Sequence, residues 1–315
     1  MILCLGTTPT VQRTMTFDRV TIDAVNRAAS VIESASGKSI NVARTLHSLG
    51  NRVLATGFLG GDSGRLIRDD LDHAGIQHHF IDVGPKTRTC TTIIDHFNHT
   101  ATELVEETQP VDPLAYDRLL NTVAANLSQA RAMVLSGSLP PQAPADFYAR
   151  CTRLARQANI PIILDARGEP LRKALAEKPT IVKPNRQELQ ETGSFPIDDD
   201  ASLQRAIREL LRQGPRWGII THGPHPAIAS DGQSFWQITP PPIQPLNPIG
   251  SGDAFAAGLA HALLEFADLP TACRFGAACG AANALNSPAG HARREDVERL
   301  LSEVQVSVLA NDPGN

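Results

Sequence analysis

The residues best suited to chemistry stand together in the segment Asn247-Pro248-Ile249-Gly250-Ser251-Gly252-Asp253. An apolar, alanine-rich stretch of helical character follows directly, at residues 254–264. A Gly-Ser-Gly turn lets the backbone approach a ligand closely, and the unpaired N–H groups at a helix N-terminus bind anions together with the helix dipole. Asp253 would lie in the first turn of that helix. The segment is therefore a candidate anion site with a carboxylate beside it.

This combination suits phosphoryl transfer. The N–H groups of Gly250, Ser251 and Gly252 would stabilise charge on the moving phosphoryl group, and Asp253 would accept the proton of the attacking hydroxyl. The alternative is that Asp253 only caps a helix, and the short motif by itself leaves this open. The P-loop pattern G-x-x-x-x-G-K-[ST] does not occur in the chain, and the glycines at 57–64 lack the spacing of a dinucleotide-binding loop.

The elements that must position this segment follow from hydrophobic periodicity. Short apolar runs bounded by turn residues predict buried strands, with stretches of helical periodicity between them. We expect strands at residues 2–5, 53–58, 132–135, 160–164, 180–182 and 217–220, and helices at 40–49, 65–73, 116–127, 145–157 and 203–212. This alternation predicts a mostly parallel sheet covered by helices on both faces. Residues 250–286 indicate consecutive helices rich in Ala and Gly.

Two stretches break the alternation. Residues 11–32 alternate polar and apolar side chains without a helix-length pattern, and residues 88–105 contain the β-prone run Thr91-Thr92-Ile93-Ile94. Together they predict a small β-subdomain separate from the main sheet. The Pro-rich residues 239–245 are expected to run extended, and residues 311–315 to fray.

Composition limits the function classes. The 315 residues, 42% hydrophobic and 20% charged, suit one large α/β domain. A formal net charge of −4 argues against broad binding to nucleic acid or anionic membrane, and no apolar run approaches the roughly 20 residues of a membrane span. Five scattered cysteines without a C-x-x-C pair favour a reducing compartment over disulfides or zinc, and the first residues lack a signal-peptide pattern. We therefore expect a cytoplasmic location.

Five segments, in one order along most of the chain, resemble signatures of the pfkB family of carbohydrate kinases. Residues 247–253 fit its C-terminal pattern D/N-x-x-G-A/S-G-D. Their exact residues are most similar to those of the branch that contains 1-phosphofructokinase and tagatose-6-phosphate kinase. The other four segments are Val25-Asn26-Arg27-Ala28 with Gly37-Lys38-Ser39-Ile40-Asn41-Val42-Ala43, then Thr87-Arg88, Leu135-Ser136-Gly137-Ser138-Leu139-Pro140 and Lys183-Pro184-Asn185-Arg186-Gln187-Glu188.

The resemblance implies a ribokinase-like three-layer α/β/α fold, with a mostly parallel central sheet and a small β-lid. One domain would span residues 1–315, with the lid built from about residues 11–35 and 86–106. In relatives the lid closes over the sugar and often forms the dimer interface, so a homodimer through the lid is expected. The implied activity is ATP-dependent, Mg²⁺-dependent phosphorylation of a hexose phosphate of the fructose 1-phosphate or tagatose 6-phosphate type.

The resemblance also implies residue roles. Asp253 would be the base, with the anion hole formed by Gly250, Ser251 and Gly252. The residues expected to contact the sugar or its phosphate are Gln12, Arg27, Gly37, Lys38, Asn41, Arg88 and Ser138. The residues expected on the nucleotide side are Lys183, Asn185, Glu188, Thr221, Gly223 and Asn283. Glu188 would hold Mg²⁺ through water, although a carboxylate favoured by the dipole at a helix start is an alternative reading of it.

The chain departs from the family pattern at the sugar end. Gln12 stands where the branch has an Asp, and unlike a carboxylate it donates as well as accepts hydrogen bonds. Ser36 and Ser39 replace glycines, Cys90 stands where relatives often have Asn, and Pro226 excludes the positive φ that a glycine adopts. A kinase for another sugar, sugar phosphate or nucleoside is therefore an alternative. A non-catalytic sugar-phosphate sensor is a second, against which the intact residues 250–253 and 185–188 argue.

Overall fold

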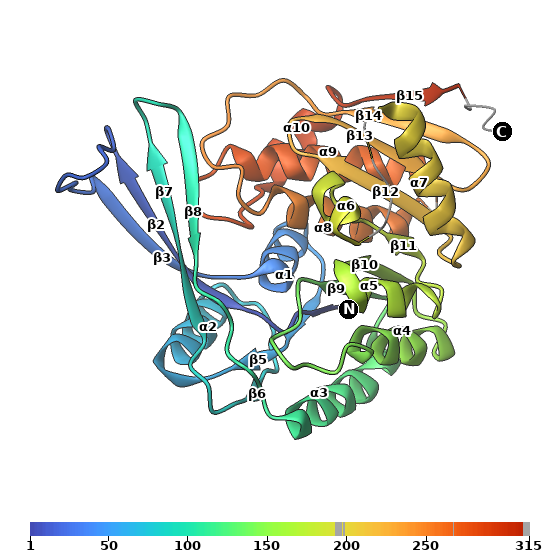
Figure 1. Cartoon of the computed structure of the whole chain (residues 1–315), viewed down its shortest axis with the longest axis horizontal. Helices are drawn as coiled ribbons and strands as arrows, with labels where there is room; N and C mark the ends of the chain where they lie inside the picture. Colours follow the sequence, from blue (N-terminus) through green and yellow to red (C-terminus); the bar gives the residue numbers. More distant parts are fainter. Residues whose placement is uncertain (193–196, 198, 267, 311–315) are drawn as a thin grey trace.

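A large, mostly parallel sheet runs through the molecule, with helices on both faces (Figure 1). The computed structural model describes residues 1–192, 197, 199–266 and 268–310; residues 311–315, which we expected to fray, lie outside the described residues. The strand order is β15-β14-β13-β12-β11-β10-β9-β1-β4, parallel from β4 to β12 and antiparallel from β12 to β15. These strands are β1 (Ile2–Leu5), β4 (Val53–Thr56), β9 (Ala132–Ser136), β10 (Ile162–Asp165), β11 (Ile181–Val182), β12 (Trp217–His222), β13 (His225–Ser230), β14 (Phe235–Thr239) and β15 (Gln305–Leu309).

The helices form the two outer layers. One face of the sheet packs against α1 (Lys38–Ser48), α2 (Gly61–His73), α8 (Ser251–Glu265), α9 (Leu269–Ala284) and α10 (Arg294–Leu301). The other face packs against α3 (Pro113–Asn126), α4 (Phe147–Gln157), α5 (Gly168–Leu175), α6 (Arg186–Thr192) and α7 (Asp200–Arg212), and a short 3₁₀ helix, η1 (Leu127–Gln129), follows α3. This is the three-layer α/β/α arrangement that the alternation of strands and helices predicts.

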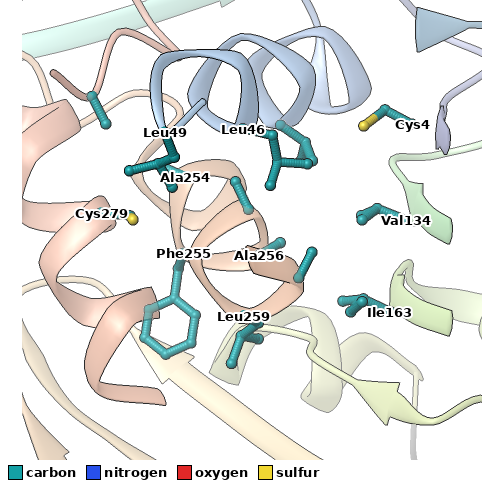
Figure 2. Packing of buried hydrophobic residues seen from close by; sticks show 14 of the residues in the cluster. Cys4, Leu46, Leu49, Val134, Ile163, Ala254, Phe255, Ala256, Leu259 and Cys279 are labelled. Carbon is teal, nitrogen blue, oxygen red and sulfur yellow. The ribbon is translucent and has the colours of Figure 1, made fainter. Parts of the chain in front are cut away.

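Strand side chains divide between the two layers. Cys4, Val134 and Ile163 point toward α1 and α8 (Figure 2). Their chain neighbours Leu3, Leu135 and Leu164 belong to the core on the opposite face. Successive side chains of a strand point to opposite faces, so a strand covered on both sides must be apolar throughout. This is why the strands were visible as short continuous apolar runs.

The strands β2 (Thr10–Phe17), β3 (Ser30–Ser36), β7 (Arg88–Asp95) and β8 (Thr100–Val105) form a second sheet, here called the small sheet, in the order β3-β2-β7-β8. It projects from the body, with the β2–β3 and β7–β8 connections at its far end (Figure 1). The two segments that broke the alternation in the sequence build it, and β2 and β7 pair in parallel at its centre.

Several boundaries and elements differ from expectation. The apolar run 53–58 is divided into β4 and β5 (Phe58–Leu59), and β5 pairs with β6 (Ile81–Asp82). The division falls at Gly57, where a Cβ would lie 2.0 Å from the carbonyl oxygen of Gly6. The antiparallel edge strands β13 to β15 and the helices α5 and α10 were not predicted. No helix among the described residues is long and apolar enough to cross a membrane.

Candidate active site

The Gly-Ser-Gly turn forms the N-terminus of α8. Gly250 is the N-cap residue and adopts a left-handed conformation with φ 84°, which a glycine adopts without strain. A Cβ at Gly250 would also lie 3.1 Å from the backbone nitrogen of Gly290. The N–H of Ser251 donates to the carbonyl of Pro248 at 3.1 Å and that of Asp253 donates to the carbonyl of Gly250 at 3.0 Å. The Ser251 N–H is therefore engaged within the turn, whereas an anion hole would require it to face a ligand.

Asp253 is buried in the first turn of α8, with only 6% of its surface exposed. Its Oδ2 accepts a hydrogen bond of 2.8 Å from Nδ2 of Asn41. Burial raises the pKa of Asp253 to about 7; Lys38 and the Asn41 hydrogen bond act in the opposite direction, and Asp165 adds to the rise. A carboxyl group with a pKa near neutrality is suited to exchange a proton with a bound hydroxyl.

Hydrogen bonds from Asn283 in α9 hold the loop before α8 in place. Nδ2 of Asn283 donates to the carbonyl of Ile249 at 2.9 Å and to Oγ of Ser251 at 3.2 Å, and its Oδ1 accepts the N–H of Gly290 at 2.7 Å. The Asn283 side chain is fully buried. Asn283, which we expected near the nucleotide, thus holds in shape the turn at residues 250–252, here called the anion turn.

A cluster of buried charges lies at the carboxyl ends of the central strands. Asp165 ends β10, and its two carboxylate oxygens lie 3.4 Å from Nζ of Lys38 and 3.4 Å from Nζ of Lys183. Lys183 is 2% exposed, and its Nζ lies 3.9 Å from where a Cβ of Gly252 would be. Ligands of open α/β sheets bind at this end of the strands. Sequence reasoning missed Asp165, although a carboxylate directly after an apolar run was a readable signal.

Asn185 and Glu188 hold each other at the start of α6. The Glu188 N–H donates to Oδ1 of Asn185 at 2.8 Å, and the Asn185 N–H donates to Oε2 of Glu188 at 2.9 Å. This reciprocal pair is a capping box. Oε1 of Glu188 also accepts a 2.8 Å bond from Lys38. Burial favours a higher pKa for Glu188, but Lys38, Lys183 and the Asn185 hydrogen bond outweigh it, so its pKa is lowered and it is ionised.

The sugar-side residues from β2 and α1 lie at the root of the small sheet. Gly37 is the N-cap of α1 with φ 104°, and a Cβ there would lie 2.8 Å from Cα of Pro9. Gln12 is buried, and its Nε2 donates to Oγ1 of Thr92 in β7 at 2.8 Å. The carbonyl of Ser138 accepts the hydroxyl of Thr7 at 3.0 Å. Ser138 also borders a pocket of about 370 Å³.

The three basic residues expected to meet the sugar phosphate lie in different places. Lys38 lies among carboxylates, as described above. Burial lowers the pKa of Lys38, but Asp165, Glu188 and Asp253 outweigh burial and the pKa is raised. Arg88 is half-buried; its guanidinium donates to the carbonyls of Glu106 at 3.0 Å and Thr8 at 3.4 Å, while its Nε is buried without a hydrogen-bond partner. Arg27 is exposed in the β2–β3 connection at the far end of the small sheet (Figure 1). The chain does not bring Arg27 to Lys38, because β3 separates them.

Thr221 and Gly223 lie beside the Lys183 segment. The N–H of Thr221 donates to the carbonyl of Pro184 at 3.3 Å, and Thr221 bridges Asn185 in parallel. Gly223 has φ 53° in the tight turn between β12 and β13, and Pro226 lies within β13. The positive φ of this turn therefore falls on Gly223 rather than on the proline.

The charge cluster fits a weakly held magnesium ion rather than a protein-built metal cage. Among the residues that the structure describes, no group of three or more His, Cys, Asp or Glu side chains is arranged to hold a metal. Mg²⁺ usually keeps several waters and binds through one or two carboxylates and substrate phosphates. Asp165 and Glu188 offer such carboxylates, both held by lysines.

Comparisons with known proteins identify the family and the fold of this chain. The model of the pfkB family of carbohydrate kinases matches residues 1–295. A candidate phosphofructokinase from Staphylococcus aureus is 28% identical with a TM-score of 0.78, over 99% of this chain and 100% of that one. A protein from Thermotoga maritima provisionally named a 1-phosphofructokinase has a TM-score of 0.91 at 21% identity, over 98% and 99% of the chains. Phosphofructokinase-2 from Escherichia coli, solved with fructose 6-phosphate, has a TM-score of 0.83 at 23% identity, over 96% and 97%. The expected fold class is confirmed.

Proposed function

The chain belongs to the pfkB family of ATP-dependent carbohydrate kinases, and from this premise we propose that it phosphorylates a hexose phosphate of the fructose 1-phosphate or tagatose 6-phosphate type. The observation that supports this most is Asp253, a buried carboxylate held by Asn41 at the N-terminus of a helix. A proton acceptor beside an anion-binding turn is what transfer of a phosphoryl group to a hydroxyl requires.

The proposed reaction is a single displacement. The acceptor hydroxyl loses its proton to Asp253 while its oxygen bonds to the γ-phosphorus of ATP. The bond from that phosphorus to the oxygen bridging it to the β-phosphate breaks, and ADP leaves with the electron pair. The N–H groups of Gly250 and Gly252 and the Lys183 ammonium, which lies close to Gly252, would stabilise charge on the moving group.

Glu188 and Asp165 would hold the nucleotide's Mg²⁺, Glu188 through water. When bound, such an ion neutralises charge on the phosphates of ATP. The lowered pKa of Glu188 keeps its carboxylate ionised for this role. Asn185 orients the Glu188 carboxylate through the capping box. Thr221 and Gly223, at the end of β12 and in the turn after it, would line the phosphates of ATP.

The acceptor's own phosphate is proposed to bind at Arg88. Its buried Nε lacks a hydrogen-bond partner, and a phosphate oxygen would satisfy it. Lys38 would lie between the nucleotide and the sugar, since its ammonium already contacts Glu188 and Asp165. Gly37, Asn41 and Ser138 would border the sugar hydroxyls.

The small sheet is proposed to act as a lid and as the interface of a homodimer. It displays exposed apolar side chains on its strands and connections: Ile22, Val25, Val31, Ile32, Phe97, Leu104 and Val105. Exposed apolar side chains gathered on one small element often mark interaction sites. The five cysteines are free thiols, which fits our proposal that the enzyme works in the reducing cytoplasm.

An acceptor panel tests the proposed substrate class. ADP release with Mg²⁺ and ATP would be measured for fructose 1-phosphate, fructose 6-phosphate, tagatose 6-phosphate, unphosphorylated fructose and adenosine, using the wild type and Arg88→Met. We expect transfer to one of the sugar phosphates, and Arg88→Met to raise KM for that acceptor more than it lowers kcat. Activity confined to unphosphorylated acceptors would overturn the proposal. No transfer to any acceptor, with tight binding of a sugar phosphate, would favour the sensor interpretation.

A kinase for another sugar or a nucleoside is the second candidate, and Gln12 favours it. The side-chain NH₂ group of Gln12 donates to Thr92 in the neighbouring strand, whereas a carboxylate at this position could only accept hydrogen bonds, including those of sugar hydroxyls. Gln12→Asp should then move the preference of the enzyme toward the sugar phosphates of the panel. An unchanged order of kcat/KM values across the panel would show that Gln12 does not set selectivity.

A further inference from the structure

Ser36 connects the small sheet to the carboxylate of Asp253. It is the last residue of β3 and is 2% exposed. Its hydroxyl donates to Oδ1 of Asn41 at 2.9 Å, and Nδ2 of Asn41 donates to Oδ2 of Asp253 at 2.8 Å. The three buried side chains therefore form one line of hydrogen bonds, from a strand of the small sheet to the first turn of α8.

The order of donors and acceptors in this line is determined by chemistry. An ionised carboxylate only accepts hydrogen bonds, so Asn41 must present its NH₂ group to Asp253. The oxygen of the same amide then points away from Asp253 and needs a donor, because a buried carbonyl without a partner is costly. The Ser36 hydroxyl is that donor. An alanine or glycine at position 36 has no side-chain group to donate.

Ser36 is itself held in place from two helices. In the residue before it, the Ala35 N–H donates to Oδ2 of Asp70 in α2, and the Ala35 carbonyl accepts a 3.2 Å bond from Nη2 of Arg44 in α1. Arg44 and Asp70 also pair at 2.8 Å. Both backbone polar groups of Ala35 are thus fixed to the body, and this holds the backbone of Ser36 in place.

We propose that Ser36 is a positioning residue, which holds the Asn41 amide with its NH₂ group toward the ionised carboxylate of Asp253. Ser36 thereby links the root of the small sheet to the proposed base. This rests on the proposed role of Asp253 in phosphoryl transfer. Position 36 carries a serine where the family pattern that the sequence resembles has a glycine, so this hydroxyl is not part of that pattern.

Other charged groups also face Asp253. They are Lys38 from α1, Asp165 at the end of β10 and Lys183 after β11. A substitution at position 36 changes none of them, and Ser36 is hydrogen-bonded to Asn41. The effect of removing the hydroxyl should therefore reach Asp253 through the amide, as a weaker hydrogen bond to its ionised form.

A carboxyl titration of the substrate-free protein tests this without any assay of activity. The ¹³C NMR signal of the Asp253 carboxyl, assigned by its loss in Asp253→Asn, would be followed against pH in the wild type, Ser36→Ala, Ser36→Gly and Ser34→Ala. Ser34 is the matched control, because it is buried on the same strand and the same face, two residues away. We expect Ser36→Ala and Ser36→Gly to raise the Asp253 midpoint by about half a pH unit or more, and Ser34→Ala to leave it in place.

The kinetic consequence is a shift of the acidic limb of the kcat/KM profile to higher pH in both Ser36 variants. Activity at pH 6 should fall several-fold, while activity at pH 9 stays near that of the wild type. An unchanged Asp253 midpoint in the Ser36 variants, or an equal shift in Ser34→Ala, would overturn the proposal. If no acceptor is phosphorylated, the proposed function fails, and the titration still decides the role of Ser36.

Discussion

At Asp253, the needs of stability and of catalysis oppose each other. A buried carboxyl group is most stable when it is protonated, and burial raises the pKa of this one to about 7. A general base must be ionised at working pH. Lys38 and the Asn41 hydrogen bond favour the ionised form, and they keep the pKa of Asp253 from rising further above neutral pH.

Asp253→Asn should abolish most of the proposed activity. The amide has nearly the same shape and its oxygen still accepts from Asn41, but it cannot take a proton from the acceptor hydroxyl. We expect kcat to fall by about two to four orders of magnitude, the usual contribution of a general base. Steady-state ADP release at saturating ATP and sugar phosphate measures it. A kcat near the wild-type value would remove Asp253 from the catalytic machinery.

The same substitution should stabilise the protein, and more so at high pH. The folded pKa of Asp253, about 7, lies above the unfolded value of roughly 3.9. Such a group contributes its full stability below the unfolded pKa and loses it as the pH rises through the folded pKa. An asparagine loses nothing in that window. The Tm of Asp253→Asn minus that of the wild type should therefore be larger at pH 8 than at pH 5, as followed by calorimetry. An equal difference at both pH values would contradict a raised pKa.

At the scale of elements, the close contact of α8 with α9 positions the anion turn. A Cβ at Gly258 would lie 2.6 Å from the carbonyl oxygen of Phe275, and a Cβ at Gly276 would lie 2.7 Å from the ring of Phe255. Glycines thus let the two backbones approach one another. Asn283, near the end of α9, can then reach the loop before α8.

Gly258→Val should therefore destabilise the protein and disturb the site. Forcing a branched side chain against a backbone that cannot yield typically costs about 1–3 kcal/mol, and chemical denaturation would measure the lost free energy of unfolding. Gly84→Val is the matched control, because a Cβ at Gly84 has no atom within 4 Å. Equal stability of the two variants would show that α8 and α9 can separate at little cost.

At the scale of the whole molecule, the small sheet projects from the body (Figure 1). Val31 and Ile32 are 45% and 39% exposed, and as neighbours on β3 they point to opposite faces of the sheet. Exposed apolar side chains on both faces, far from the main core, suggest that a second copy of the chain covers them.

The double substitution Val31→Glu and Ile32→Glu should convert the proposed dimer to a monomer. Whichever face is used, one carboxylate would be buried without a partner, and we expect the dimer dissociation constant to rise roughly tenfold or more. Sedimentation velocity over a concentration series would measure it. Leu114→Glu, on α3 at 69% exposure, is the control and should leave association unchanged. A wild type that sediments as a monomer would refute the dimer.

The sequence by itself determined the layered architecture and the anion turn, because both depend on local information. Strands buried on two faces must be continuous apolar runs, and the turn at Gly250 needs residues that permit a left-handed conformation. The edge strands β13 to β15 escaped prediction. Their exposure is mixed, so their apolar pattern is incomplete.

Only the tertiary structure decided which side chains meet in the site. Asn41 and Asp253 are 212 residues apart, and Lys38 and Glu188 are 150 apart. Residue type states that a carboxylate, an amide or an ammonium needs partners but not which ones, so Asp165 was overlooked and the hydrogen bond from Asn283 to the loop before α8 was not foreseen. Packing brings the carboxyl ends of strands and the N-termini of helices to one edge, and only that packing pairs buried polar groups from distant segments.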